Sequence, residues 1–279
     1  MNDLVHRVTT FIEAAKKSQS LKNGNLLGEL RFLRTCTTRT PKVTLPAPSF
    51  LHFFGGRDFA DPGVYPDRDA FFADVVALYR AEIAELVAGG ARYLQLDEVP
   101  VAMLCDPDVR ERVRADGEDP DALLDCYVAA ANRALAARPP ELTVAMHLCR
   151  GNLRGHWMAA GGYEAIAERL FGTLDVDAFV LEYDSERAGD FAPLRFVPAS
   201  TRVVLGLVST KTRALESADA LCRRIDAAAR VVPLDRLGIS PQCGFASTAG
   251  GNPLTADDQR AKLARVVEVA RRVWGARGS

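Results

Sequence analysis

The sequence has no apolar run long enough to cross a bilayer and no dense block of lysine or arginine. A membrane-spanning helix needs roughly 20 consecutive apolar residues. Binding to nucleic acid or to an anionic membrane depends on clustered basic side chains. These absences predict a protein that engages neither a membrane nor nucleic acid. The first residues, Met1 to His6, also lack the regions of a signal peptide, which predicts a cytoplasmic protein.

The six cysteines are too few, in a chain of 279 residues, for the disulfide framework of a small secreted protein. We therefore expect each cysteine to be a core residue, a metal ligand or a nucleophile. Only Cys149 and Cys243 follow apolar strand patterns closely. Core packing is favoured for the other four, which are Cys36, Cys105, Cys126 and Cys222.

Short apolar segments alternate with helical segments from about residue 41 onward. These segments are apolar throughout, which is typical of parallel strands covered by helices. We count six strand–helix units, with strands expected from Pro41 onward and near 93–96, 142–146, 178–181, 202–208 and 237–239. The helices expected after them lie near 67–88, 120–137, 162–171, 214–230 and 255–275. Residues 1–40 are predicted to form a broken helical segment before a single domain over 41–279.

Metal-competent side chains follow three of these strands. His147 and Cys149 are two residues apart, so they point to the same side of a strand end. Glu182 follows the next strand and Cys243 follows the last one. The carboxyl ends of parallel strands hold the active sites of (β/α) barrels and doubly wound sheets. Each motif taken alone is also compatible with a strand end that carries a buried thiol. Together the four residues predict one tetrahedral zinc site.

The ligand set favours one kind of chemistry. A zinc ion held by two thiolates and one carboxylate would carry a net charge of about −1, which makes it a poor source of hydroxide. Such an ion suits the binding of a substrate thiol, whose pKa it lowers while keeping the thiolate nucleophilic. Glu182 is the ligand that an incoming thiol would displace most easily. The pattern therefore predicts thiol alkylation rather than hydrolysis.

Several separated motifs resemble the C-terminal catalytic domain of cobalamin-independent methionine synthase and its short stand-alone bacterial relatives. They are His147-Leu148-Cys149-Arg150-Gly151, Glu182 after an apolar strand, Leu205-Gly206-Leu207-Val208 and Ser240-Pro241-Gln242-Cys243-Gly244-Phe245. The similarity extends from about Pro41 to Trp274. The resemblance implies an α/β fold, the TIM (β/α)8 barrel of the uroporphyrinogen-decarboxylase-like superfamily, with Zn2+ on His147, Cys149, Glu182 and Cys243. It also implies methyl transfer from a methyltetrahydrofolate-type donor to homocysteine, which gives methionine.

The resemblance also points to substrate-binding residues. In that family an Asp at the end of the preceding strand contacts the amino group of homocysteine, which makes Asp97 the candidate and Glu98 its neighbour. An exposed acidic loop is the alternative. His52, at another strand exit, is a further candidate for substrate binding, with a plain loop histidine as the alternative. Trp157 and Phe245 would line an apolar wall, although core packing is favoured for both.

The chain departs from the family pattern at two points. Lys211 stands where family members carry a His thought to protonate the departing folate, so Lys211 is a candidate proton donor or a residue that holds a carboxylate. The two strand units that open the family's barrel, with their substrate-binding Ser and Glu, have no match in residues 1–40. We therefore expect a barrel without its first two βα units, in an oligomer or with a partner that completes it. The alternatives are alkyl transfer to another thiol or from a corrinoid donor, and an inactive zinc-binding barrel that serves as a partner subunit.

Overall fold

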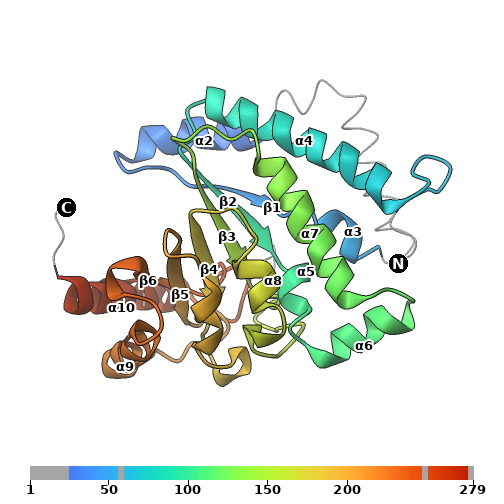
Figure 1. The fold of residues 1–279 in the computed structure, drawn as a ribbon. Helices are drawn as coiled ribbons and strands as arrows, with labels where there is room; N and C mark the ends of the chain where they lie inside the picture. The colour runs from blue at the N-terminus through green and yellow to red at the C-terminus, as the bar shows by residue number, and fades with distance from the viewer. Residues whose placement is uncertain (1–24, 56–59, 247–250, 276–279) are drawn as a thin grey trace.

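The computed structural model describes residues 25–55, 60–246 and 251–275. Six parallel strands form one sheet and follow each other in the order of the sequence (Figure 1). They are β1 (Val43–Pro46), β2 (Tyr93–Glu98), β3 (Thr143–Leu148), β4 (Ala178–Glu182), β5 (Arg202–Val208) and β6 (Leu237–Pro241). Sequential parallel strands joined by helices are the arrangement of a (β/α)8 barrel, here with six of its units. The predicted α/β class and the six βα units are confirmed.

Helices connect the strands close to where the apolar spacing predicted them. They are α2 (Asn25–Cys36), α3 (Phe50–Phe53), α4 (Arg68–Ala88), α5 (Pro100–Met103), α6 (Pro107–Ala115), α7 (Pro120–Leu135), α8 (Ala167–Phe171), α9 (Ala218–Ala229) and α10 (Ala256–Trp274). Helix α9 begins four residues later than predicted, because residues 214–217 form the loop that precedes its N-cap, Ser217. Residues 1–24 of the predicted helical segment lie outside the described residues. The division between residues 1–40 and 41–279 stays a prediction.

Local capping signals decide where the long helices begin and end. The Asp67 side chain accepts the backbone N–H of Ala70 and so starts α4. Thr255 and Asp258 form a reciprocal capping box at the start of α10. This helix ends before Gly275, whose φ of 74° lies in the left-handed region that favours glycine. These signals were readable in the sequence, and the predicted helix boundaries there are confirmed.

The two faces of the sheet differ. Alternate strand residues form an apolar face that is buried under the helices, and they include Val43, Leu45, Leu94, Leu96, Val144, Met146, Phe179, Leu181, Val203 and Leu205. Figure 1 shows α4 and α7 side by side over the β1–β3 end of the sheet, while α9 and α10 lie beside β5 and β6. The opposite face carries Asp97 and His147 as register partners on β2 and β3. The helices therefore cover the apolar face, and the polar side chains at the carboxyl ends of the strands stay available to form a site.

All six cysteines are free thiols. Cys105 is buried, and Cys126 and Cys222 pack half-buried against the core, as predicted. The packing prediction is wrong for Cys36, which is exposed because it is the last residue of α2 and that helix end faces solvent.

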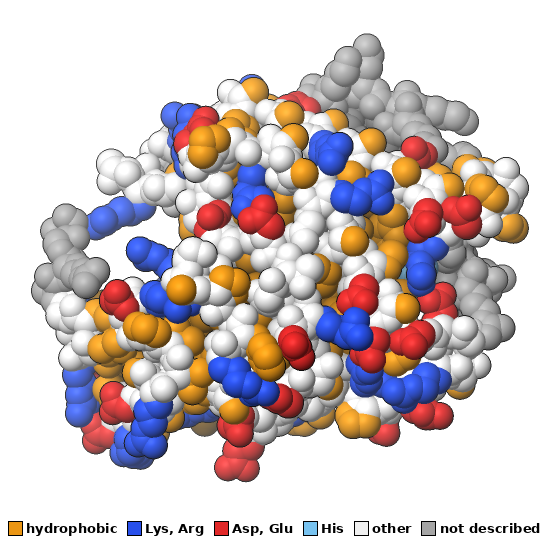
Figure 2. Space-filling model, viewed as in Figure 1, with side chains coloured by type: hydrophobic (Ala, Val, Ile, Leu, Met, Phe, Trp, Pro, Cys, Tyr) orange, Lys and Arg blue, Asp and Glu red, His pale blue; other side chains and the backbone are white. Residues whose placement is uncertain are grey.

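Acidic and basic side chains are interspersed over the face shown in Figure 2, without a large patch of either sign on that face. Within the part of the chain that the structure describes, no helix combines the length and the apolar composition that a bilayer crossing needs.

Candidate metal centre and its charged surroundings

Three of the four predicted metal ligands meet at the carboxyl end of the sheet. The ligand atoms of His147, Cys149 and Cys243 all lie within 4.8 Å of one another. Cys243 Sγ is 3.8 Å from His147 Nε2. Tetrahedral zinc with bonds of about 2.1 to 2.3 Å places its ligand atoms about 3.5 to 3.8 Å apart. The three side chains therefore fit a zinc ion in both chemistry and spacing.

Strand geometry and a strained turn bring these ligands together. His147 lies near the end of β3 and Cys149 directly follows that strand, so their spacing of two puts both on one side. The Nδ1 atom of His147 is 3.2 Å from the carbonyl oxygen of Val180, which orients the ring and leaves Nε2 facing Cys243. Cys243 has a φ of 53°, a left-handed conformation that is uncommon outside glycine. Such strain is characteristic of functional sites.

The hydrogen bond between the two thiols shifts their pKa values in opposite directions, lowering that of Cys149 and, together with burial, raising that of Cys243. A hydrogen bond from Cys243 holds the pKa of the Cys149 thiol well below its usual value, and the hydrogen bond and charge of His147 add to this effect against the opposing effect of burial. Burial by itself would lower the pKa of His147. The hydrogen bond to Cys149 and the negative charges of Cys149, Asp97 and Glu182 outweigh burial and raise it. The lowered pKa favours the thiolate form of Cys149, which is the form that binds metal ions.

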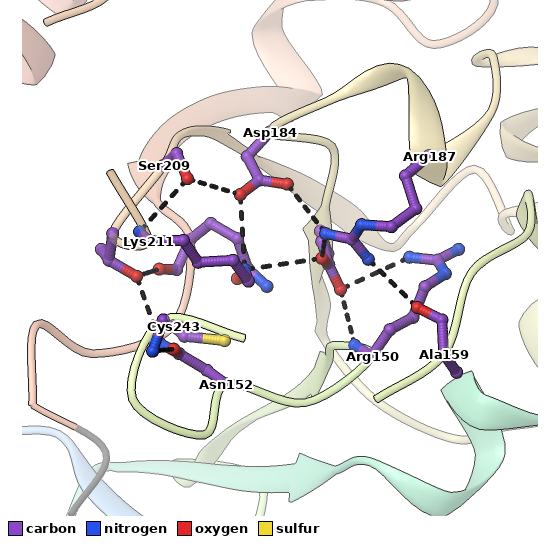
Figure 3. Close-up of polar contacts among 12 residues, drawn as sticks. Arg150, Asn152, Ala159, Asp184, Arg187, Ser209, Lys211 and Cys243 are labelled. Carbon is purple, nitrogen blue, oxygen red and sulfur yellow. Dashed lines mark hydrogen bonds and ion pairs between the residues drawn. The ribbon is translucent and has the colours of Figure 1, made fainter. Parts of the chain in front are cut away.

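Glu182 lies buried beside this cluster, but its carboxylate is held by cations. Oε2 accepts the backbone N–H of Arg150 at 2.5 Å and lies 3.5 Å from the Arg150 guanidinium. Oε1 pairs with Arg187 and lies 3.6 Å from the Nζ of Lys211 (Figure 3). Burial would raise the pKa of Glu182, but the charges of Lys211, Arg150 and Arg187 outweigh it and lower the pKa. The role of Glu182 as a fourth ligand stays a prediction.

Lys211 is buried against two carboxylates. Its Nζ donates to Asp184 Oδ2 at 3.3 Å and lies 3.6 Å from Glu182 Oε1. Asp184 also accepts the Ser209 hydroxyl at 2.8 Å and lies 3.4 Å from Arg187 (Figure 3). Sequence reasoning missed Asp184, although it follows Glu182 by two residues and so lies on the same side of the strand end. The proton-donor role of Lys211 stays a prediction.

Asp97 and Glu98 point to opposite sides of β2. Asp97 is the register partner of His147 and its charge acts on that imidazole, so it lies next to the cluster as expected. Glu98 is buried on the helix side, where it accepts the Ser49 hydroxyl at 2.6 Å and the Val101 N–H at 2.9 Å. Burial raises the pKa of Glu98 to about 7 despite these hydrogen bonds. The geometry thus separates the two acidic residues that the sequence pattern grouped together.

His52 is neither exposed nor in a loop, so the alternative of a plain loop histidine is wrong. It lies in α3, and its Nδ1 is 2.8 Å from the hydroxyl of Tyr127. The rings of Phe71 and Phe72 surround it. Burial and, secondarily, the charge of Arg68 lower the pKa of His52 to about 4, so the ring is neutral at neutral pH. His52 also lines an apolar groove of about 420 Å³. Its contact with substrate stays a prediction.

The loop after β3 exposes an aromatic side chain beside the charged network. Trp157 is 57% exposed, so the core-packing prediction for it is wrong. The Arg187 guanidinium stacks 4.8 Å from the centre of its ring, which holds the indole at the surface. Phe245 is half-buried and lies outside the main hydrophobic core. Trp157 is thus the better placed of the two to form an apolar wall.

Two further residues tie the site loops together, and sequence reasoning assigned a role to neither. The Nδ2 of Asn152 donates to Thr210 Oγ1 at 3.3 Å and to the carbonyl oxygen of Gly244 at 3.2 Å (Figure 3). It therefore links the loops that carry Cys149, Lys211 and Cys243. The Tyr163 hydroxyl lies between the ends of β3 and β4 and bonds to both.

Comparisons with known proteins show which family and which proteins this chain is similar to. The family model described as the catalytic domain of cobalamin-independent synthase matches residues 58–272. YxjH, an uncharacterized protein of Bacillus subtilis (strain 168), is 45% identical over 250 residues, which are 89% of this chain and 66% of that protein. The methionine synthase of Pyrococcus abyssi (strain GE5 / Orsay) is 28% identical over 233 residues, which are 83% of this chain and 59% of that enzyme.

A solved structure shows the same fold. It is the crystal structure of a Listeria monocytogenes protein provisionally assigned as a vitamin-B12-independent methionine synthase, with a TM-score of 0.65 and 32% sequence identity. The similarity covers 86% of this chain and 65% of that one. The chain thus spans less than two thirds of the length of each of these three relatives.

Proposed function

Because the chain belongs to the cobalamin-independent synthase catalytic-domain family, we propose that it is a zinc-dependent methyltransferase that methylates the sulfur of a substrate thiol. Homocysteine is the proposed acceptor and methionine the product. The observation that carries this proposal is the meeting of His147, Cys149 and Cys243 at the carboxyl end of the sheet. Two thiolates and an imidazole suit thiol activation better than hydrolysis.

The three clustered residues would hold the ion. Zinc bound there would lower the pKa of the substrate thiol and keep the thiolate nucleophilic at neutral pH. Asp97, the register partner of His147, is the proposed acceptor of a hydrogen bond from the amino group of homocysteine. Cys149, His147 and Glu182 are buried, and Cys243 is half-buried.

The proposed methyl donor is a methyltetrahydrofolate-type molecule. In an in-line displacement the thiolate sulfur forms the new bond to the methyl carbon while the nitrogen–methyl bond of the donor breaks. The departing nitrogen then takes up a proton, and Lys211 is the proposed donor because it stands where family members carry a His. Its two carboxylate partners hold the ammonium group in place.

Metal analysis combined with thiol titration tests the proposal. We expect one zinc ion per chain, and we expect homocysteine to release about one proton per chain when it binds as a thiolate. Methyl transfer is then measured with methyltetrahydrofolate. Cys243→Ser is expected to lose zinc and activity together. A folded wild-type protein without metal would refute the proposal.

Lys211 also favours a second enzymatic possibility. A lysine in place of the family His leaves room for a donor that needs no protonated leaving nitrogen, such as a methyl-corrinoid, or for another acceptor thiol. Parallel assays with methylcobalamin and methyltetrahydrofolate, each with homocysteine and other thiols, distinguish these reactions. A chain that binds zinc but transfers no methyl group would instead support the binding-subunit hypothesis, which the edge strands β1 and β6 favour.

A further inference from the structure

The Asp97 carboxylate is held by the side chain that lies two residues before it on β2. The amide Nε2 of Gln95 donates to Asp97 Oδ1 at 2.6 Å. Because residues two apart on a strand lie on the same side, both side chains lie on the face of the sheet that carries His147. Gln95 is buried and Asp97 is half-buried, so this hydrogen bond is largely shielded from water.

Lys42 fixes the orientation of the Gln95 amide. It directly precedes β1, two residues before Thr44, which is the register partner of Gln95. Its Nζ donates to Gln95 Oε1 at 2.8 Å. An ammonium group only donates hydrogen bonds and an ionised carboxylate only accepts them, so the amide fits between Lys42 and Asp97 in one orientation. Lys42 therefore keeps the amide nitrogen turned toward Asp97.

The charges at the two ends of this row act on each other. Burial lowers the pKa of Lys42, and the negative charge of Asp97 opposes that decrease. Hydrogen bonds in series polarise one another, so the contact of Lys42 with the amide oxygen strengthens the bond that the amide nitrogen makes. The row thus holds the Asp97 carboxylate more firmly than an isolated amide would.

This arrangement leaves one oxygen of Asp97 available to a ligand. Among the residues that the structure describes, Gln95 is the only hydrogen-bond donor to the Asp97 side chain, and it uses Oδ1. Asp97 is the register partner of His147, and neighbouring strands lie about 4.8 Å apart. An oriented carboxylate beside a thiol-binding centre suits a substrate that carries an ammonium group a few atoms from its sulfur.

We propose that Gln95, anchored by Lys42, is a positioning residue that fixes the Asp97 carboxylate for the ammonium group of an amino-thiol substrate. This inference rests on the proposed function and adds the residues that set the preference for amino thiols over thiols without an amino group. Homocysteine belongs to this class, with three carbon atoms between its sulfur and its nitrogen. Gln95 acts through Asp97 and does not itself contact the substrate.

Two acceptor thiols separate positioning from a general structural effect. Homocysteine and 4-mercaptobutyrate share the thiol and the carboxylate, and only homocysteine carries the amino group. The zinc-loaded wild type and Gln95→Met are assayed with methyltetrahydrofolate and each thiol. Methionine has about the size of glutamine but makes neither of its hydrogen bonds. We expect kcat/KM to fall about 10-fold or more for homocysteine and to stay nearly unchanged for 4-mercaptobutyrate. An equal decrease with both thiols, or no decrease, would overturn the inference.

Lys42→Met tests the anchor at the half-buried end of the row, and it keeps the test available if Gln95→Met does not fold. It is expected to reduce the preference for homocysteine in the same direction but by less, because the bond between Gln95 and Asp97 remains. An unchanged preference would overturn the anchoring role of Lys42.

Thr44→Val is the matched control. Thr44 is the register partner of Gln95, and its side chain makes no hydrogen bond among the described residues. Valine has nearly the shape of threonine, so the preference for homocysteine should not change. A decrease as large as that of Gln95→Met would overturn the inference.

An Asp97→Asn background shows whether Gln95 acts through Asp97. Adding Gln95→Met to Asp97→Asn is expected to cause no further loss of the preference for homocysteine, whereas an additive loss would overturn the inference. A wild type that methylates both thiols with equal kcat/KM would overturn this inference and leave the proposed function intact. A wild type that methylates neither thiol would overturn both.

Discussion

The hydroxyl of Tyr163 accepts the backbone N–H of Glu182 at 3.0 Å. The same hydroxyl donates to the carbonyl oxygen of Leu148 at 3.2 Å, one residue before Cys149. One buried side chain therefore joins the ends of β3 and β4, and these ends carry Cys149 and Glu182. This oxygen atom adds a side-chain link to the strand pairing that already holds the two ends together.

Tyr163→Phe is expected to lower the free energy of unfolding by about 1 to 3 kcal/mol, because it leaves buried backbone groups without their partner. It should also weaken zinc affinity, since one of the links between the ends of β3 and β4 is lost. Urea unfolding and zinc competition with a chelator measure the two effects. Tyr183→Phe is the matched control: its buried hydroxyl has no hydrogen-bond partner among the residues that the structure describes, so its loss should leave both quantities nearly unchanged. Equal effects of the two substitutions would contradict the prediction.

Glu98 should make the protein less stable as the pH rises. Its pKa is raised by burial from 4.5 to about 7 in the folded chain, so its contribution to stability is complete below pH 4.5 and is lost as the pH rises through 7. The loss amounts to about 3 kcal/mol. We expect the unfolding free energy of the wild type, relative to Glu98→Gln, to fall by this amount between pH 4.5 and 8. Urea unfolding across that range measures it, and a constant difference would refute it.

His52 should have the opposite effect. Burial lowers its pKa from 6.5 to about 4, so its contribution is complete above pH 6.5 and is lost as the pH falls toward 4. The loss is again about 3 kcal/mol. The wild type, relative to His52→Gln, is expected to lose stability over this interval in urea unfolding. Gln is a suitable comparison because it cannot titrate and can still bond the Tyr127 hydroxyl. A stability difference that stays constant, or that moves in favour of the wild type as the pH falls, would contradict the buried neutral ring.

Lys211 is tested by two substitutions that separate charge from proton donation. Lys211→Arg keeps a cation between Glu182 and Asp184, so zinc content and fold should be preserved. Arginine does not deprotonate in proteins, so kcat with a folate-type donor should fall about 100-fold or more. Lys211→Met also removes the charge and should destabilise the fold by about 3 to 5 kcal/mol. Steady-state kinetics and thermal unfolding provide the readouts. An arginine variant with unchanged kcat would exclude Lys211 as the proton donor.

Much of the fold was predictable because the signals that specify it are local. Capping residues such as Asp67 and Thr255 mark the starts of α4 and α10. Apolar runs without alternation identified parallel strands, and their count of six is confirmed. The exposure of Trp157 was not predictable, because it depends on Arg187, a residue 30 positions away that stacks on its ring.

The sequence by itself determined the strand ends, the spacing of His147 and Cys149, and the family to which these motifs point. These features follow from the two-residue period of a strand and from side-chain chemistry. Only the tertiary structure decided which charges surround Glu182, because Arg150, Arg187 and Lys211 come from three separate loops. Electrostatic compensation in a buried site depends on distances between such loops, and no local pattern encodes them.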